Sequence, residues 1–132
     1  MFLVTIIIGS SALPAGSVSG PDQVNVYYFH FTRRCATCLN VEKVARESVE
    51  SLFPDQVKKE EITFQSINLD EETGKAVGKK YNIEGQTLIV ICGDKRVDLT
   101  DKAFLYANGS PEKLKAEIRK AVEKVLSSEV AK

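Results

Sequence analysis

Two cysteines, Cys35 and Cys38, lie at the junction between a strand-like segment and a helix-like segment. Residues 24–31 are mostly β-branched, aromatic or otherwise apolar, which is typical of a strand buried on both faces. In residues 39–53, apolar side chains recur mostly at intervals of three or four, which indicates an amphipathic helix. The chain is therefore confined to folds in which a strand leads directly into a helix whose first turn carries two thiols.

The whole chain has strand or helix signals in the order β-α-β-α-β-β-α. The segments are, in order, 24–31, 39–53, 62–69, 71–81, 87–92, 95–99 and 111–126. Asp70 is expected to cap the second helix. Gly93-Asp94 is a two-residue turn signal, and the polar residues 95–99 suit a sheet edge and suggest a monomer. Parallel strands joined by a helix need a right-handed crossover. The sequence therefore predicts an α/β fold, a four-stranded mixed sheet with helices on both faces.

The charged residues divide the chain into an uncharged leader and a charged domain. The 18 Lys+Arg and 18 Asp+Glu all lie beyond residue 20. The apolar run at residues 2–8, followed by small residues, has the outline of a secretory signal peptide, although no basic residue precedes it. We therefore expect residues 1–20 to be a signal-like or disordered segment and residues 21–132 to be the domain. The domain is then periplasmic or membrane-anchored, or cytoplasmic if the segment is not a signal.

The net charge and the length of the apolar run argue against nucleic-acid binding and against a membrane-spanning helix. The formal net charge is zero, whereas binding to nucleic-acid phosphates needs a basic excess. The apolar run is far shorter than the roughly 20 residues of a membrane-spanning helix. We therefore expect no nucleic-acid partner and no stable membrane span in the mature domain.

The position and spacing of Cys35 and Cys38 favour redox chemistry. Residues three apart on a helix share a face, so the two sulfurs can meet. The unpaired N–H groups and the positive dipole at a helix start favour a thiolate, which is the nucleophile. Arg33 and Arg34 add two positive charges immediately before Cys35, and we expect them to lower its pKa further. We predict that Cys35 attacks a substrate and that Cys38, one turn further inside, resolves the mixed disulfide.

The chain resembles the thioredoxin-like superfamily over about residues 23–127. The resemblance rests on YFHF at 28–31 before CATC at 35–38, on YNIEGQTL at 81–88, and on the order of the elements. It is similar to the short thioredoxin-like proteins of prokaryotes. The resemblance implies a thiol–disulfide oxidoreductase that needs no organic cofactor. Its implied partners are the thiols and disulfides of other proteins, together with a separate redox partner that recycles it.

One departure from the family pattern lies in the loop that contacts substrate. The resemblance assigns this loop to Gly85, Gln86 and Thr87, where the proline usual in the family is missing. A cis bond before a non-proline residue costs about 3–4 kcal/mol, so we expect trans bonds here. The family proline also helps to keep metals off the thiols, so its absence leaves a metal-binding alternative open.

A second departure concerns the buried acidic residue that serves thioredoxin as a proton relay. The corresponding position, six residues before Cys35, holds Phe29. The neighbouring His30 is titratable, but alternation along the strand directs it to the opposite face of the sheet from Phe29. Water or Glu42 could then take over proton transfer.

Cys92 and His30 define the metal-binding alternative. Together with Cys35 and Cys38 they would supply the four ligands of a Cys₃His zinc site. However, Cys92 ends a strand whose other end lies about 16–17 Å away, near the cysteine pair. We therefore predict a buried, apolar role for Cys92 and no metal site. The rival to an oxidoreductase is a non-catalytic thioredoxin-like binding module or a metal-thiolate carrier.

Overall fold

The structure, a computed structural model, describes residues 23–127. The predicted leader, residues 1–20, lies outside the described residues. The strands are β1 (Val24–His30), β2 (Ile62–Asn68), β3 (Thr87–Cys92) and β4 (Lys95–Asp98). The helices are α1 (Ala36–Leu52), α2 (Pro54–Lys58), α3 (Glu72–Tyr81), α4 (Thr100–Tyr106) and α5 (Pro111–Ser127).

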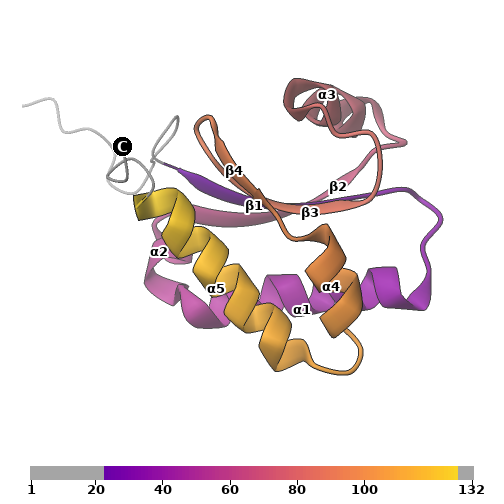
Figure 1. The fold of residues 1–132 in the computed structure, drawn as a ribbon. Coiled ribbons are helices and arrows are strands. Elements are labelled where there is room, and N and C mark those ends of the chain that lie inside the picture. The colour runs from indigo at the N-terminus through magenta and orange to yellow at the C-terminus, as the bar shows by residue number, and fades with distance from the viewer. Residues whose placement is uncertain (1–22, 128–132) are drawn as a thin grey trace, which may run out of the picture.

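The four strands form one mixed sheet in the order β2-β1-β3-β4. β1 lies inside the sheet, parallel to β2 and antiparallel to β3, and β4 is antiparallel to β3 at the edge. α1 makes the crossover between the parallel pair (Figure 1). The near-continuous apolarity of β1 is explained by this inner position, since all but one of its residues are buried. The predicted α/β fold with a four-stranded mixed sheet is confirmed.

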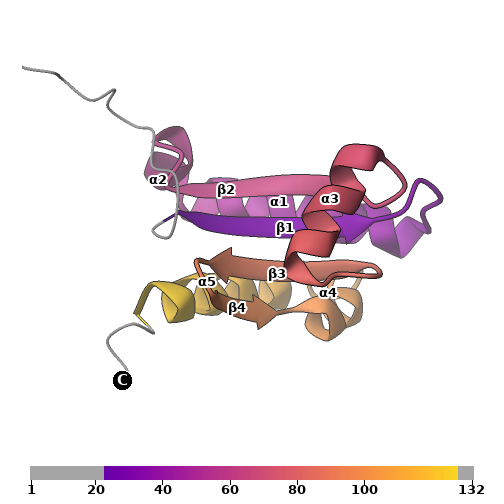
Figure 2. The ribbon, with the colours of Figure 1, turned by 90° about the horizontal axis from the view of Figure 1, so that it is seen from above.

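The two faces of the sheet carry different helices. α1, α4 and α5 lie on one face and α3 lies on the other (Figures 1 and 2). Side chains alternate along β1, so that Val26 and Tyr28 enter the core with α1 and α5, while Tyr27 and Phe29 enter a smaller core beneath α3. The face of Tyr28 is therefore the face of α1, which carries the second cysteine.

Two short helices, α2 and α4, fall in segments for which the sequence predicted no helix. α2 begins at Pro54, directly after the helix predicted over residues 39–53; a proline fits a first turn because the N–H it lacks has no partner there. α4 follows Asp98, whose carboxylate accepts hydrogen bonds from the N–H and the hydroxyl of Thr100 at 2.9 and 2.6 Å. Helices this short are decided by such local contacts, because they are too short to show a period.

The expectation that Asp70 caps α3 is wrong. The N-cap residue is Glu71, and its side chain makes no capping hydrogen bond. Asp70 instead accepts a hydrogen bond from the backbone N–H of Thr32 at 2.8 Å. This hydrogen bond lowers the pKa of Asp70. The carboxylate therefore ties the loop after β2 to the loop that leads from β1 into the cysteines.

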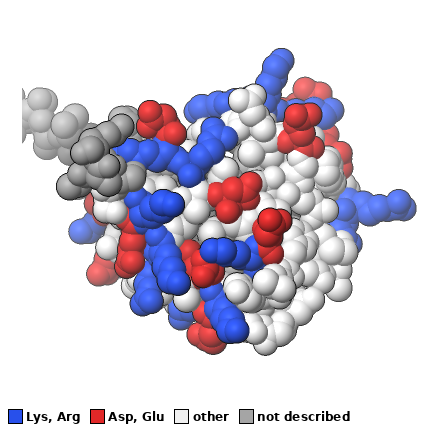
Figure 3. All heavy atoms as spheres, viewed as in Figure 1, with Lys and Arg blue, Asp and Glu red and all other residues white. Residues whose placement is uncertain are grey.

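Charges of both signs intermingle over the face of the molecule shown in Figure 3. This distribution is consistent with the balanced composition of the sequence. Within residues 23–127, no helix has the length and apolarity that crossing a membrane requires.

Candidate active site

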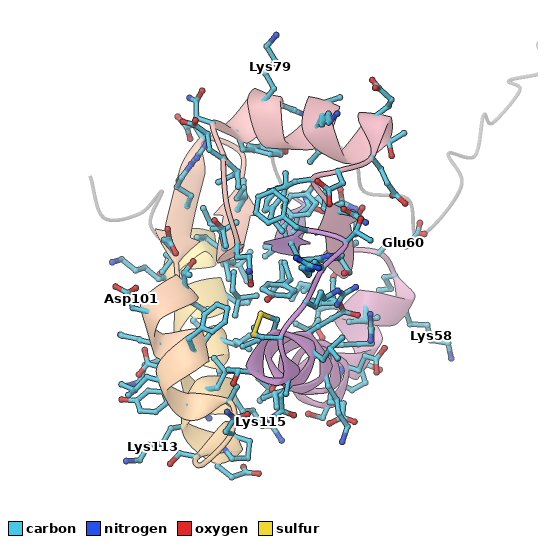
Figure 4. All side chains as sticks on the ribbon, turned by 90° about the vertical axis from the view of Figure 1, so that its right-hand side faces the viewer. Lys58, Glu60, Lys79, Asp101, Lys113 and Lys115 are labelled. Atoms are coloured by element: carbon cyan, nitrogen blue, oxygen red, sulfur yellow. A yellow bond between two sulfur atoms is a disulfide. The ribbon has the colours of Figure 1, made fainter. Side chains whose placement is uncertain are left out.

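Cys35 and Cys38 form a disulfide beside the first turn of α1, with their Cα atoms 5.0 Å apart (Figure 4). Cys35 is the N-cap residue of α1, and its Sγ accepts a hydrogen bond from the backbone N–H of Cys38 at 3.1 Å. This N–H is one of those that a helix start leaves without a backbone partner. After reduction, the same N–H and the positive end of the helix dipole would stabilise a thiolate on Cys35.

The two cysteines differ in their exposure to solvent. Cys35 is exposed, whereas Cys38 is only 2% exposed. Thiol–disulfide exchange requires the attacking sulfur to reach a sulfur of its partner. Only Cys35 is open to a large partner, so the geometry is compatible with the predicted order of attack and resolution.

The loop before β3 lies against the disulfide. Gln86 is half-buried, and its Oε1 lies 3.0 Å from the Sγ of Cys38. The same Oε1 accepts a hydrogen bond from the hydroxyl of Tyr28 at 3.2 Å. Thr87 donates a hydrogen bond from its hydroxyl to the carbonyl of Gly85 at 2.9 Å, which bends the loop. The peptide bonds of this loop are trans, as predicted, since residues 23–127 contain no cis bond.

The loop that carries the cysteines is anchored on both sides. Before them, Thr32 is bound to Asp70 as described above. Between them, the hydroxyl of Thr37 accepts a hydrogen bond from the side chain of Asn108 at 2.9 Å. One turn later, Asn40 donates a hydrogen bond to the carbonyl of Ala107 at 2.8 Å. These contacts join the start of α1 to the loop after β2 and to the end of α4, and so hold the disulfide in place.

Arg34, predicted to tune Cys35, is engaged by a carboxylate of α1. It forms an ion pair and a hydrogen bond with Glu42, which also binds Arg46 at 2.9 Å. Arg33 is exposed to solvent. Because Glu42 offsets the charge of Arg34, part of the positive field expected at Cys35 is neutralised. The tuning of Cys35 by Arg33 and Arg34 stays a prediction.

A partly buried chain of hydrogen bonds leads from Glu42 to His30. Ser66 donates to Oε1 of Glu42 at 2.8 Å, and its hydroxyl oxygen lies 2.8 Å from Nε2 of His30. Nδ1 of His30 lies 3.0 Å from the carbonyl oxygen of Phe31. Burial of Glu42 acts to raise its pKa, but hydrogen bonds from Ser66 and the two arginines outweigh burial and lower it. Glu42 is therefore held as a carboxylate.

This chain places His30 on the face of α1. His30 and Phe29 face opposite sides of the sheet, as alternation predicts, but Phe29 packs beneath α3. The face that meets the helix of the cysteines is the one with His30 and Tyr28, whose rings are 5.7 Å apart. The position six residues before Cys35 is therefore not the position that faces the disulfide. The spacing of the resembled family assigns the relay position to Phe29, and this spacing does not show which face of β1 meets α1.

The structure does not bring Cys92 to the disulfide. Cys92 is buried, as predicted, and pairs with Val24 at the start of β1. His30 is at the other end of β1, next to the loop of Cys35. The length of the strand therefore separates Cys92 from the other three residues of the hypothetical Cys₃His set.

The chain was compared with protein-family models, curated proteins and solved structures. No protein-family model matches the chain, and no curated protein matches it. Among solved structures, it is similar to a thioredoxin of Fasciola hepatica, with a TM-score of 0.47 and 20% identity over 76% of this chain and 82% of that one. It is also similar to a structure described as a malarial protein, with a TM-score of 0.47 and 18% identity over 75% and 97% of the two chains.

The class of the domain follows from its own topology. A sheet in the order β2-β1-β3-β4 with β3 and β4 antiparallel, and a C-x-x-C disulfide between β1 and α1, together define a thioredoxin-like fold. The fold and the cysteine pair support a redox-type role.

Proposed function

We propose that this protein is a thiol–disulfide oxidoreductase whose reacting groups are Cys35 and Cys38. The observation that carries the proposal is their disulfide at the start of α1, with one cysteine exposed and the other buried. A disulfide stabilises a fold mainly by closing a long loop of the unfolded chain. A bond between residues three apart closes almost none. The position of the bond therefore favours a reactive role over a stabilising one.

The reaction is a two-electron exchange. In the reduced protein, the Cys35 thiolate attacks a substrate disulfide R–S–S–R′, forms a mixed disulfide with R–S and expels R′–S⁻. Cys38 then loses its proton, and its thiolate attacks the Sγ of Cys35. This closes the Cys35–Cys38 bond seen in the structure and expels R–S⁻. The two expelled thiolates take up two protons, so the substrate is reduced and the protein is oxidised.

The surface around the disulfide suits a polypeptide substrate. Leu39, which follows Cys38, has an apolar side chain that is 54% exposed. At the same end of the sheet a cleft of about 430 Å³ opens, with Phe31, Leu69 and Ile83 among its lining residues. An exposed leucine beside a cleft whose lining also includes Lys79 and Glu84 suits contact with another polypeptide. The proposed partners are therefore protein thiols and disulfides, and a second redox protein would recycle the pair.

The uncharged leader supports an exported location for this activity. Residues 1–20 hold none of the charged residues of the chain, and their apolar run followed by small residues has the outline of a secretory signal peptide. We propose that the domain works there, as the sequence predicted.

The proposal predicts a large difference in reactivity between the two thiols. In the reduced protein, we expect Cys35 to react with iodoacetamide at least about tenfold faster than Cys38, and to do so below the pKa of about 8.5 of a free cysteine. Labelling across a pH series, followed by peptide mass spectrometry, measures each cysteine separately. Buried Cys92 is an internal control for unfolding. Equal, slow labelling of Cys35 and Cys38 would contradict the proposal and favour a static disulfide.

A further inference from the structure

We propose that the carboxamide of Gln86 controls the protonation of Cys38, and that Tyr28 holds this carboxamide in the required orientation. The inference rests on the proposed function, because it concerns the resolving thiol of that reaction. It assigns a role to two side chains, one from β1 and one from the loop before β3. In this account Gln86 touches a reacting atom, whereas Tyr28 acts through Gln86 as a positioning residue.

The contact between Gln86 and Cys38 distinguishes a thiol from a thiolate. Oε1 of Gln86 lies 3.0 Å from the Sγ of Cys38, and Cys38 is only 2% exposed. A carboxamide oxygen is an acceptor only. In the reduced protein it can accept a hydrogen bond from the thiol, whereas a thiolate would face its partial negative charge without water to screen it. The contact therefore favours the neutral form and raises the pKa of Cys38.

Tyr28 decides which end of the carboxamide faces the sulfur. Its hydroxyl donates a hydrogen bond to the same Oε1 at 3.2 Å, and its side chain is fully buried. Burial raises the pKa of Tyr28 to about 12, so the hydroxyl remains a donor throughout the range in which thiols titrate. A donor at this position favours the amide oxygen over the amide nitrogen. Without it, the side chain could turn and present an N–H to the sulfur.

Other charged groups around this pair offset one another. Arg34 and Glu42 act on the pKa of Tyr28 in opposite directions, and they are bound to each other. His30, on the same strand, has its ring 5.7 Å from that of Tyr28 and is bound to Ser66. Cys35 shares the first turn of α1 and would carry the thiolate of the reduced pair. In Cys35→Ser that thiolate is absent, so burial and the contact with Gln86 are the influences that remain on the pKa of Cys38.

This arrangement sets the order of the two steps in the proposed reaction. While Cys38 is held as a thiol, Cys35 is the nucleophile that attacks the substrate. The mixed disulfide then persists until Cys38 gives its proton to the expelled R′–S⁻ and attacks the Sγ of Cys35. The proline that the resembled superfamily usually has in this loop offers no side-chain hydrogen-bond acceptor to a thiol. Gln86 thus controls the lifetime of the mixed disulfide.

Two conservative substitutions should shift the pKa of Cys38 in opposite directions. Tyr28→Phe frees the carboxamide to donate an N–H to the thiolate, so the pKa should fall by about 0.5–1 unit. Gln86→Glu places a carboxylate against the sulfur, so the pKa should rise by about one unit or more. The pKa is read from the ¹³Cβ shift of Cys38 against pH in the full chain with Cys35→Ser. With Cys35 present, the mixed disulfide should be resolved about 3–10-fold faster in Tyr28→Phe and about tenfold more slowly in Gln86→Glu.

Matched changes elsewhere provide the controls. Gln56→Glu on the exposed surface of α2 and Tyr106→Phe on α4 should leave the pKa of Cys38 unchanged, and circular dichroism checks the fold of each variant. The proposal is overturned if Tyr28→Phe and Gln86→Glu leave the pKa unmoved or shift it in the same direction. If wild-type Cys35 fails to exchange with any disulfide, the proposed function fails, while the pKa shifts still decide the role of Gln86.

Discussion

Replacing Cys38 with serine will trap this protein on its substrate. In Cys38→Ser, the Cys35 thiolate still attacks a disulfide, but no neighbouring thiol remains to displace the bound half. Cys92 cannot replace Cys38, because it lies at the opposite end of β3 from the loop of Gln86. The mixed disulfide can then be cleaved only by a thiol from solution, and this bimolecular reaction is slower than the intramolecular attack by Cys38. We expect the mixed disulfide to live on the order of a hundredfold longer, or more.

Glutathione disulfide is a sufficient probe for this prediction. Intact-mass spectrometry after mixing should show a stable glutathione adduct on Cys38→Ser and only a transient one on the wild type. Cys35→Ser should form no adduct, and Cys92→Ser should behave as the wild type. The prediction fails if Cys38→Ser forms no adduct, or if Cys35→Ser forms as much adduct as Cys38→Ser does.

Gly74→Ala will destabilise the domain more than any other glycine-to-alanine substitution in a described helix. A Cβ atom on Gly74 would lie 1.7 Å from the carbonyl oxygen of Asn68 and 2.6 Å from its carbonyl carbon. These are backbone atoms at the end of β2, so they cannot rotate aside, and α3 must move off the sheet. Overpacking of this kind costs about 3 kcal/mol, which exceeds the gain of about 1 kcal/mol from the better helix propensity of alanine.

The other glycines supply a graded control series. Gly109→Ala meets nothing within 4 Å and should leave the free energy of unfolding nearly unchanged. Gly78→Ala would bring its Cβ within 2.8 Å of a methyl group of Leu69, which is flexible, so its cost should be intermediate. Urea denaturation measures all three. A Gly74→Ala protein as stable as the wild type would show that α3 does not pack this closely on β2.

The same contact links α3 to the candidate active site. The side chain of Asn68 donates a hydrogen bond to the hydroxyl of Thr32 at 3.0 Å, and Asp70 binds the N–H of Thr32 at 2.8 Å. Thr32 is three residues before Cys35. A displacement of α3 that shifts Asn68 should therefore loosen the loop that carries the disulfide.

Much of the fold could be predicted because its signals are local. The apolar and β-branched residues of β1 predicted a strand over 24–31, and the structure has Val24–His30. The helix of the cysteine pair begins at Ala36 rather than at 39, because Cys35 is its N-cap residue and Cys38 lies in its first turn. Asp70 shows the limit of local signals, since a backbone N–H 38 positions away along the chain binds the carboxylate that was expected to cap α3.

The two cysteines of the candidate site could be predicted from the sequence, but the contact of Gln86 with Cys38 could not. The C-x-x-C spacing and the following helix identified Cys35 and Cys38. The contact of Gln86 with Cys38 depends on the pairing of β1 with β3, which sets Tyr28 opposite Leu88 and so brings its hydroxyl to the loop. No short-range pattern encodes that register. The one signal in the sequence was a polar residue in a loop where the resembled superfamily has proline.

The most direct test of a redox role is a titration of the Cys35–Cys38 pair in the wild-type protein against reduced and oxidised glutathione. Thiol trapping followed by mass spectrometry measures the fraction of the pair that is oxidised at each ratio. A reactive pair should show one reversible two-electron transition, with a midpoint between about −270 and −120 mV, the range of thioredoxin-like oxidoreductases. A pair that stays oxidised throughout, with a potential below about −300 mV, would be a structural disulfide and would contradict the account.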